Sequence, residues 1–217
     1  MNLLALFGMA FGVGFSGAVA PGPVLFATVR WSARRGRWVG PIVTLGHMIV
    51  EVPLMAAVVL GLGAVLRAPR FVGIVGLAGG AVLLAMGVLM VRGAPRASLP
   101  PRDDASEGRE TIELWRIAAT GALTSLSNPY FPLWWSTVGL NLLAQAAPAG
   151  LVGYSVFYVG HVLADLVWYS AVSESMHRGR RLMSDRGYRW LIGGCGVLMA
   201  AFGVFFAVRG YGFLTRG

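Results

Sequence analysis

The sequence predicts an all-α membrane protein, with six transmembrane helices as two inverted three-helix repeats and with helices 1 and 4 broken at Pro motifs. Composition is the first observation behind this class: 56% of the 217 residues are hydrophobic, only 12% are charged, and the mean hydropathy is +0.69. These values lie outside the range of soluble globular proteins. The second observation is that six apolar runs are long enough, at roughly 20 residues, to cross a bilayer. They lie at about 3–29, 40–66, 71–91, 115–140, 149–173 and 190–208.

One long polar connection divides the six predicted spans into two halves. The segment 92–114 carries five of the nine carboxylates of the chain, together with Pro and Ser, which is typical of a solvated linker. We therefore predict a first three-helix repeat at 1–93, a cytoplasmic linker at 94–113 and a second three-helix repeat at 114–217. The first apolar run resembles a signal peptide, but no Arg or Lys precedes it and Pro21 would follow the cut, so we assign it as a membrane helix.

Arginine placement is the third observation, and it sets the predicted orientation. All 18 basic residues are arginines, and 14 of them lie in or near the first, third and fifth connections, which the positive-inside rule places in the cytoplasm. Both termini are therefore predicted to lie outside. With three spans per half, the second half enters the membrane from the side opposite to the first, so the repeats are inverted. Because the arginines lie between apolar runs, the net charge of +9 does not indicate a nucleic-acid partner.

Corresponding spans of the two halves share local patterns, as repeats would. Spans two and five each carry Gly-His with a carboxylate four residues after the histidine. Spans one and four each contain a pair of prolines, and spans three and six each end in Val-Arg-Gly. The matching segments are 46–51 with 160–165, 20–26 with 128–134, and 91–93 with 208–210.

The proline pairs predict that spans one and four are broken helices. A proline removes one amide donor and crowds the carbonyl four residues back, and such carbonyls are tolerated at membrane depth only beside protein or a watery cavity. Half-helix ends at such breaks bind ions or substrate carboxylates, and a simple kink is the alternative. We expect free carbonyls at Gly17, Val19, Ser125 and Asn128. We assign substrate binding or gating to Pro21, Gly22, Pro23, Asn128 and Pro129.

The two histidine–carboxylate pairs are the most informative polar residues of the spans. His47 with Glu51, and His161 with Asp165, lie one helical turn apart within apolar sequence. An acidic side chain at the centre of a membrane helix costs about 2.5–3.5 kcal/mol on insertion scales, so two matching groups indicate a use. They could exchange protons, bind a substrate ammonium group, or ligate a metal ion. Internal hydrogen bonds that tie neighbouring helices together are the alternative without a direct role.

Other patterns exclude some functions and leave others open. The chain has no phosphate-binding loop, no His-Glu-x-x-His and no Gly-x-Ser-x-Gly motif, which excludes an ATP-driven pump within this chain; no cofactor is predicted. An intramembrane enzyme that uses histidine and carboxylate as acid and base stays open. Glycines in spans three and six predict close helix contacts, within the monomer or in a homodimer. They are Gly73, Gly76, Gly79, Gly80, Gly193, Gly194 and Gly196.

Several motifs resemble the lysine-exporter (LysE) family of amino-acid efflux proteins. They are GFSGAVAPGPVLFATVR at 14–30, Asn128-Pro129 in the fourth span, six spans in about 200 residues and a charged central loop. The resemblance implies export of amino acids or related small metabolites from a bacterial or archaeal cytoplasm, driven by a proton or ion gradient. Two features differ from the family pattern: Tyr130 stands where members commonly carry Lys, and the Gly-His-x-x-x-acid pairs are not part of it. Related families in the wider superfamily handle metal ions.

Together these features predict a multi-pass secondary exporter of the cytoplasmic membrane that works by alternating access. Its partners would be a small-molecule substrate and the lipid bilayer, with a homodimer possible in principle. Glu51 and Asp165 would carry the coupling proton or meet the substrate amine, while His47 and His161 would tune or relay it. The alternative is a divalent metal exporter that uses the same four side chains as ligands.

Overall fold

The computed structural model describes residues 2–101 and 107–216, so residues 102–106 of the predicted linker lie outside the described residues. All regular elements in the described residues are helical. The α-helices are α1 (Leu3–Ala18), α2 (Pro23–Arg35), α3 (Val39–Ala57), α4 (Gly63–Arg67), α5 (Pro69–Gly93), α6 (Glu107–Leu126), α7 (Tyr130–Trp134), α8 (Leu140–Ala146), α9 (Gly150–Gly179) and α10 (Asp185–Arg216). Short π-helical segments are η1 (Val58–Leu62) and η3 (Trp135–Gly139), and short 3₁₀ segments are η2 (Ala94–Arg96) and η4 (Ala147–Ala149).

Several helices are long and apolar enough to cross a membrane. Within the described residues there are four such segments, or five when the bent pair α1 and α2 is counted as one span. The chain is therefore a multi-pass α-helical membrane protein. The four segments are Val39–Arg67, Pro69–Arg96, Tyr130–Gly179 and Asp185–Thr215. The third joins the end of the predicted fourth span to the fifth, so a count of six spans stays a prediction.

The first proline motif breaks the helix as predicted. Helix α1 ends at Ala18, α2 begins at Pro23, and the two axes meet at 74°. Pro23 occupies the first helical position, where its missing amide leaves no helical hydrogen bond unmade. The carbonyl of Gly17, which we expected to be free, accepts a hydrogen bond from the Ala20 amide at 3.1 Å. The chain therefore repairs this end of α1 with a tighter turn.

The second proline motif also breaks the helix, between the end of α6 and the start of α7. The side-chain oxygen of Asn128 accepts a hydrogen bond from the Tyr130 amide at 3.1 Å, which caps the new helix. The expectation of free carbonyls is wrong here too. The Ser125 carbonyl accepts from the Asn128 amide at 3.1 Å, and the Asn128 carbonyl accepts from the Phe131 amide at 3.0 Å. Local turns satisfy these groups, so they are not available as bare ligands.

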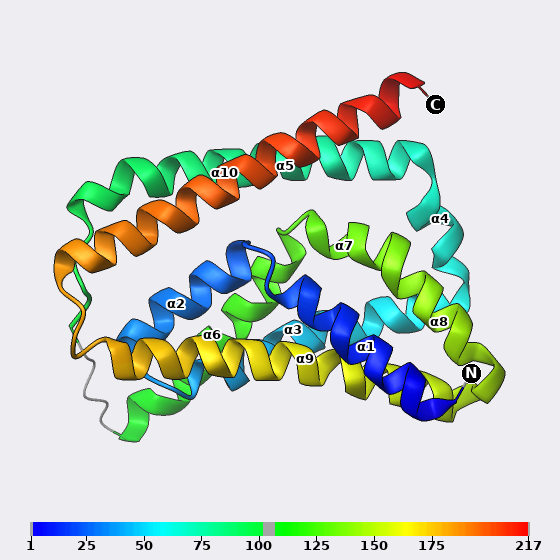
Figure 1. Cartoon of the computed structure of the whole chain (residues 1–217), viewed down its shortest axis with the longest axis horizontal. Helices are drawn as coiled ribbons and strands as arrows, with labels where there is room; N and C mark the ends of the chain where they lie inside the picture. The colour runs from blue at the N-terminus through cyan, green and yellow to red at the C-terminus, as the bar shows by residue number, and fades with distance from the viewer. Residues whose placement is uncertain (1, 102–106, 217) are drawn as a thin grey trace.

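Helices α5 and α10 lie side by side along one edge of the molecule, and α1, α2, α3, α6 and α9 form a second group (Figure 1). The two long helices run antiparallel, with glycines in contact at every second turn. A Cβ added at Gly80 would lie 2.7 Å from the Gly203 carbonyl oxygen. The other facing pairs are Gly73 with Gly210 and Gly87 with Gly196.

The glycine contacts settle part of the sequence prediction. Gly73, Gly76, Gly80 and Gly196 contact the partner helix within the monomer, so they give no support to a homodimer. Gly79 instead faces the second break, since a Cβ added there would lie 2.1 Å from the Pro129 side chain. Among the described residues of the monomer nothing lies within 4 Å of Gly194, and Gly193 makes only an ordinary contact, so the predicted close contacts of these two glycines are not made inside the monomer.

The two termini lie at the same end of the molecule (Figure 1). The end of α2, the start of α6, the end of α9 and the start of α10 lie at the opposite end (Figure 1). These are the segments next to the arginine-rich connections of the sequence. The arrangement therefore separates the termini from the basic end of the molecule.

Candidate functional site

Helices α3 and α9 bring the two Gly-His-x-x-x-acid segments together. The glycine before each histidine allows close approach to a helix of the other half of the chain. A Cβ added at Gly46 would lie 1.8 Å from the Ala118 carbonyl oxygen on α6, and one added at Gly160 would lie 2.9 Å from the Phe7 carbonyl oxygen on α1. Each histidine is thus fixed by a backbone contact that a larger residue would prevent.

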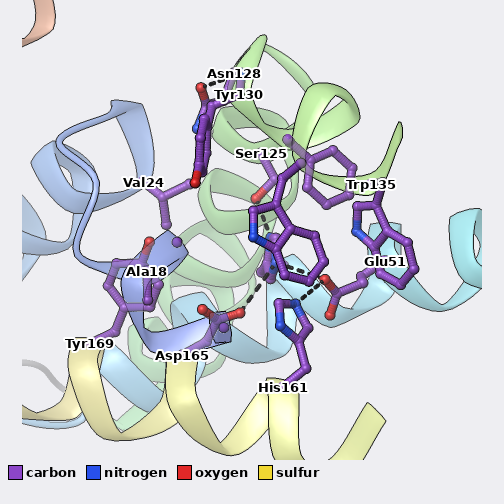
Figure 2. A pocket seen from close by; sticks show the side chains of 15 residues that line it. Ala18, Val24, Glu51, Ser125, Asn128, Tyr130, Trp135, His161, Asp165 and Tyr169 are labelled. Carbon is purple, nitrogen blue, oxygen red and sulfur yellow. Dashed lines mark hydrogen bonds and ion pairs between the residues drawn. The ribbon is translucent and has the colours of Figure 1, made fainter. Parts of the chain in front are cut away.

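The four ionisable side chains form one cluster. The Nε2 atom of His161 lies 2.7 Å from Oε1 of Glu51. The Nε2 atom of His47 lies 3.4 Å from the same Glu51 oxygen and 3.4 Å from Oδ2 of Asp165. Figure 2 shows Glu51, His161 and Asp165 turned toward one another. The sequence predicted pairs within each helix, but the shortest contact joins α3 to α9.

The side chains of this cluster are buried, so each polar atom that lacks a hydrogen-bond partner costs free energy. Glu51 is 0% exposed, and His161 and Asp165 are each 5% exposed. Glu51 Oε2, His161 Nδ1 and Asp165 Oδ2 have no hydrogen-bond partner among the described residues. A buried polar group without a partner costs about 1–3 kcal/mol, so the cluster has unused capacity for a proton, a polar ligand or a cation.

Ser125 fixes the orientation of His47, and sequence reasoning did not assign it a role at the site. Its Oγ lies 2.7 Å from Nδ1 of His47 and donates its only proton to the Gly121 carbonyl at 2.7 Å. The serine oxygen therefore accepts from Nδ1–H of His47. In the neutral ring, Nε2 then presents a lone pair to two carboxylate oxygens. That arrangement is stable only with a proton on Nε2 or a cation between these groups. A buried serine three residues before the Asn-Pro break was the available sequence signal.

The cluster lies in a cavity of about 60 Å³, which is room for a few water molecules. Both breaks border it: Ala18 and Val24 flank the first break, and Asn128 lies in the second. The breaks also meet, because a Cβ added at Gly22 would lie 3.2 Å from Nδ2 of Asn128. Of the five residues that we assigned to substrate binding or gating, Asn128 lines the cavity. Pro21, Gly22, Pro23 and Pro129 lie beside it and are not among its lining residues.

Aromatic rings enclose the two imidazoles. The Trp134 ring stacks on His161, with centroids 4.5 Å apart and an angle of 25° between the planes. Phe131 meets the His47 ring edge to face at 5.3 Å. Such contacts hold each imidazole in place. Trp134 and Tyr169 line the cavity, whereas Trp168 does not.

The cluster also has the composition of a metal site. One donor atom from each of His47, Glu51, His161 and Asp165 lies within 4.8 Å of all the others. Two imidazole nitrogens and two carboxylate oxygens are common ligands of divalent transition metals. The geometry therefore suits a proton, an ammonium group or a metal ion, as the sequence suggested.

Comparison with known proteins decides the family. The family model described as LysE type translocator matches residues 15–210. The chain belongs to the LysE family. This confirms the resemblance seen in the sequence, and it makes the protein a membrane transporter by family. Because the LysE family consists of transporters and not of enzymes, it argues against an intramembrane enzyme.

Two relatives of known name match the chain over most of its length. YcgF of Bacillus subtilis (strain 168), named as a candidate amino acid efflux protein, is 28% identical over 199 residues, which cover 91% of this chain and 93% of YcgF. The chemotactic transduction protein ChpE of Pseudomonas aeruginosa is 29% identical over 204 residues, which cover 91% of this chain and 95% of ChpE. No solved structure matches the chain significantly.

Proposed function

We propose that this LysE-family protein is a secondary active exporter of amino acids or related small metabolites. One observation carries the proposal: four ionisable side chains from α3 and α9 meet in a buried cavity that both helix breaks border. Family membership supports a transporter, and the similarity to YcgF, which is named for amino acid efflux, supports amino-acid efflux.

An amino acid carries an ammonium group and a carboxylate close together, and the cavity offers a partner for each. Glu51 and Asp165 supply negative charge for the ammonium group. The side-chain amide of Asn128 and the first turn of α2 at Val24 lie at the cavity edge, where amide N–H groups favour a carboxylate. Because the cavity has room for only a few waters, a substrate enters only when the helices around it separate. This supports alternating access around the cluster.

Coupling to a proton or ion gradient uses the same side chains in our proposal. Glu51 or Asp165 carries the coupling proton when the substrate amine is absent, and His47 and His161 relay or tune it. The 2.7 Å contact between His161 and Glu51 provides a direct route for a proton between the two halves.

The architecture that we propose for this mechanism is six spans in two inverted repeats, 1–93 and 114–217. Helix packing supports it, because exchanging the halves converts the contacts among α1, α3, α5, α6, α9 and α10 into one another. Packing of α1 on α9 becomes packing of α6 on α3, while α5 with α10 and α3 with α9 each convert into themselves. Inverted repeats of this kind allow one half to rock against the other. The basic end would face the cytoplasm of a bacterium or archaeon, with both termini outside.

An efflux assay in proteoliposomes tests the proposal. Vesicles loaded with single amino acids, with and without a pH gradient, identify the substrate and its coupling. The variants Glu51→Gln and Asp165→Asn should each reduce the initial flux at least tenfold with unchanged expression, because they remove a buried charge with little change in shape. Glu174→Gln is the matched control, since Glu174 pairs with Arg178 near the end of α9, outside the cavity. Normal flux in both cluster variants would remove this assignment.

A further inference from the structure

The cluster between α3 and α9 contains a donor set that selects among cations. It offers two imidazole nitrogens and two carboxylate oxygens, and it contains no thiolate. Mg²⁺ and Ca²⁺ prefer all-oxygen sites, whereas Zn²⁺ and its first-row neighbours accept mixed nitrogen and oxygen ligands. The donor chemistry therefore points to a divalent transition-metal ion.

Two distances in the cluster fit a four-coordinate ion, and the four donor atoms all lie within 4.8 Å of one another. Zn–N and Zn–O bonds of about 2.0–2.1 Å require neighbouring ligand atoms about 3.3–3.4 Å apart in a tetrahedron. The Nε2 atom of His47 lies 3.4 Å from a Glu51 oxygen and 3.4 Å from an Asp165 oxygen. The 2.7 Å contact between His161 and Glu51 is a hydrogen bond and would open by about 0.6 Å when its proton leaves. Small side-chain rotations would complete the site.

Buried polar atoms without hydrogen-bond partners are the second observation that points to a bound ligand. Glu51 Oε2 and Asp165 Oδ2 are buried and have no hydrogen-bond partner among the described residues. The lone pair that Ser125 leaves on His47 Nε2 also faces carboxylate oxygens. A dication placed among the four side chains of the cluster would replace this repulsion with four attractive contacts.

A histidine that binds a metal through one ring nitrogen usually has a hydrogen-bond partner on the other. Ser125 is such a partner for His47. Ser125 holds Nδ1–H and so leaves Nε2 free to bind the ion. Partners of this kind fix the ring and its tautomer, and their loss typically weakens metal binding 10–100-fold. His161 has no such partner on Nδ1 among the described residues, so its orientation depends on stacking against Trp134.

We propose that His47, Glu51, His161 and Asp165 bind one divalent first-row transition-metal ion, for which Zn²⁺ is the probe. The ion bridges α3 and α9 and displaces the proton shared by His161 and Glu51. A further consequence of this metal site rests on the proposed function. The ion occupies the place of the coupling proton and the substrate amine, so metal binding and export exclude each other.

Calorimetric titration of the purified full chain in detergent with Zn²⁺ tests the binding. We expect one ion per chain and net proton release, measured by repeating the titration in buffers of different ionisation enthalpy. His47→Ala and Asp165→Asn should each lower the affinity at least 100-fold, and Ser125→Ala should lower it 10–100-fold. The matched control is His177→Ala, because His177 lies with Arg37 and Arg181 in a separate pocket at the end of α9.

X-ray absorption spectroscopy of the Zn²⁺-loaded wild type identifies the metal ligands directly. This measurement does not depend on whether the variants fold. It should show four nitrogen or oxygen neighbours at about 2.0–2.1 Å with scattering from two imidazoles. No binding by the wild type, or binding that His177→Ala abolishes and the cluster variants leave intact, would overturn the inference. If the wild type binds no Zn²⁺ while Glu51→Gln still abolishes efflux, the inference fails and the exporter stands. If Zn²⁺ binds but both carboxylate variants transport normally, the roles assigned to Glu51 and Asp165 in export fail and the metal site stands.

Discussion

Single glycines set the position of the buried histidines. At Gly46 the backbone of α3 lies so close to α6 that an added Cβ would be 1.8 Å from the Ala118 carbonyl oxygen. No rotamer relieves that contact, because the neighbouring atom is backbone. Movement of α3 away from α6 would carry His47 with it and would stretch its hydrogen bond to Ser125. The glycine thus links helix packing to the geometry of the cluster.

Replacing Gly46 with alanine should therefore destabilise the protein and disturb the site. We expect a loss of about 1–3 kcal/mol, typical of an overpacked contact, seen as a lower Tm in detergent. Gly194→Ala is the control on α10, where nothing lies within 4 Å, so alanine should be neutral or slightly stabilising there. Equal Tm values for the two variants would contradict the tight contact at Gly46.

Residue spacing predicted the members of the cluster but not their pairing. The four-residue interval placed His47 beside Glu51 and His161 beside Asp165, because one helical turn is a local property. The contact between His161 and Glu51 depends on how α3 and α9 cross, which no local pattern encodes. Ser125 was missed for the same reason, since its role appears only when α6 packs against α3.

At the scale of elements, the breaks were predictable because proline acts on its own neighbourhood. Loss of an amide and crowding of the preceding turn follow from the residue type alone, and both helices break where expected. The fate of the freed carbonyls was not predictable. Tight turns repair those of Gly17, Ser125 and Asn128, whereas no backbone amide among the described residues bonds to the Val19 carbonyl. Whether such a turn forms depends on the path of the chain after the break.

The antiparallel pair α5 and α10 offers a test at the same scale. Its glycines recur every seven residues, at 73, 80 and 87 on one helix and at 196, 203 and 210 on the other. Such spacing keeps small residues on one face of each helix and lets the two backbones touch. Because Gly80 and Gly203 face each other, a side chain on either one forces the two helices apart.

We expect Gly80→Ala and Gly203→Ala each to lower the Tm, and the double variant to lose less stability than the sum of the two. The first substitution already separates the helices, so the second meets less resistance, and contacting sites couple by about 0.5–3 kcal/mol. Thermal unfolding of the four proteins in one detergent measures the coupling. Gly93→Ala serves as the control, because nothing lies within 4 Å of that position. Strict additivity would contradict direct contact between the two glycines.

At the scale of the whole molecule, exchange of the halves relates the main contacts, yet the cluster itself is asymmetric. His161 donates to Glu51 at 2.7 Å, while His47 lies 3.4 Å from Asp165. Ser125 holds His47, and His161 has no corresponding partner among the described residues. With the two halves as the inverted repeats that we propose, exchange of the halves converts this arrangement into one that pairs His47 closely with Asp165. In the transport cycle that we propose, the two arrangements alternate as the halves rock.

An ion that holds all four ligands at once would stop this alternation, so Zn²⁺ should inhibit export. In proteoliposomes we expect efflux of the identified substrate to fall as Zn²⁺ saturates the site and to recover when EDTA removes the ion. The decisive comparison uses Ser125→Ala, provided that it retains measurable flux. Its inhibitory concentration should rise by the same 10–100-fold factor as its Zn²⁺ dissociation constant, while His177→Ala should shift neither. Inhibition that is unchanged in Ser125→Ala despite weakened binding would mean that Zn²⁺ acts elsewhere on the transporter, because occupancy of one site fixes both quantities by mass action.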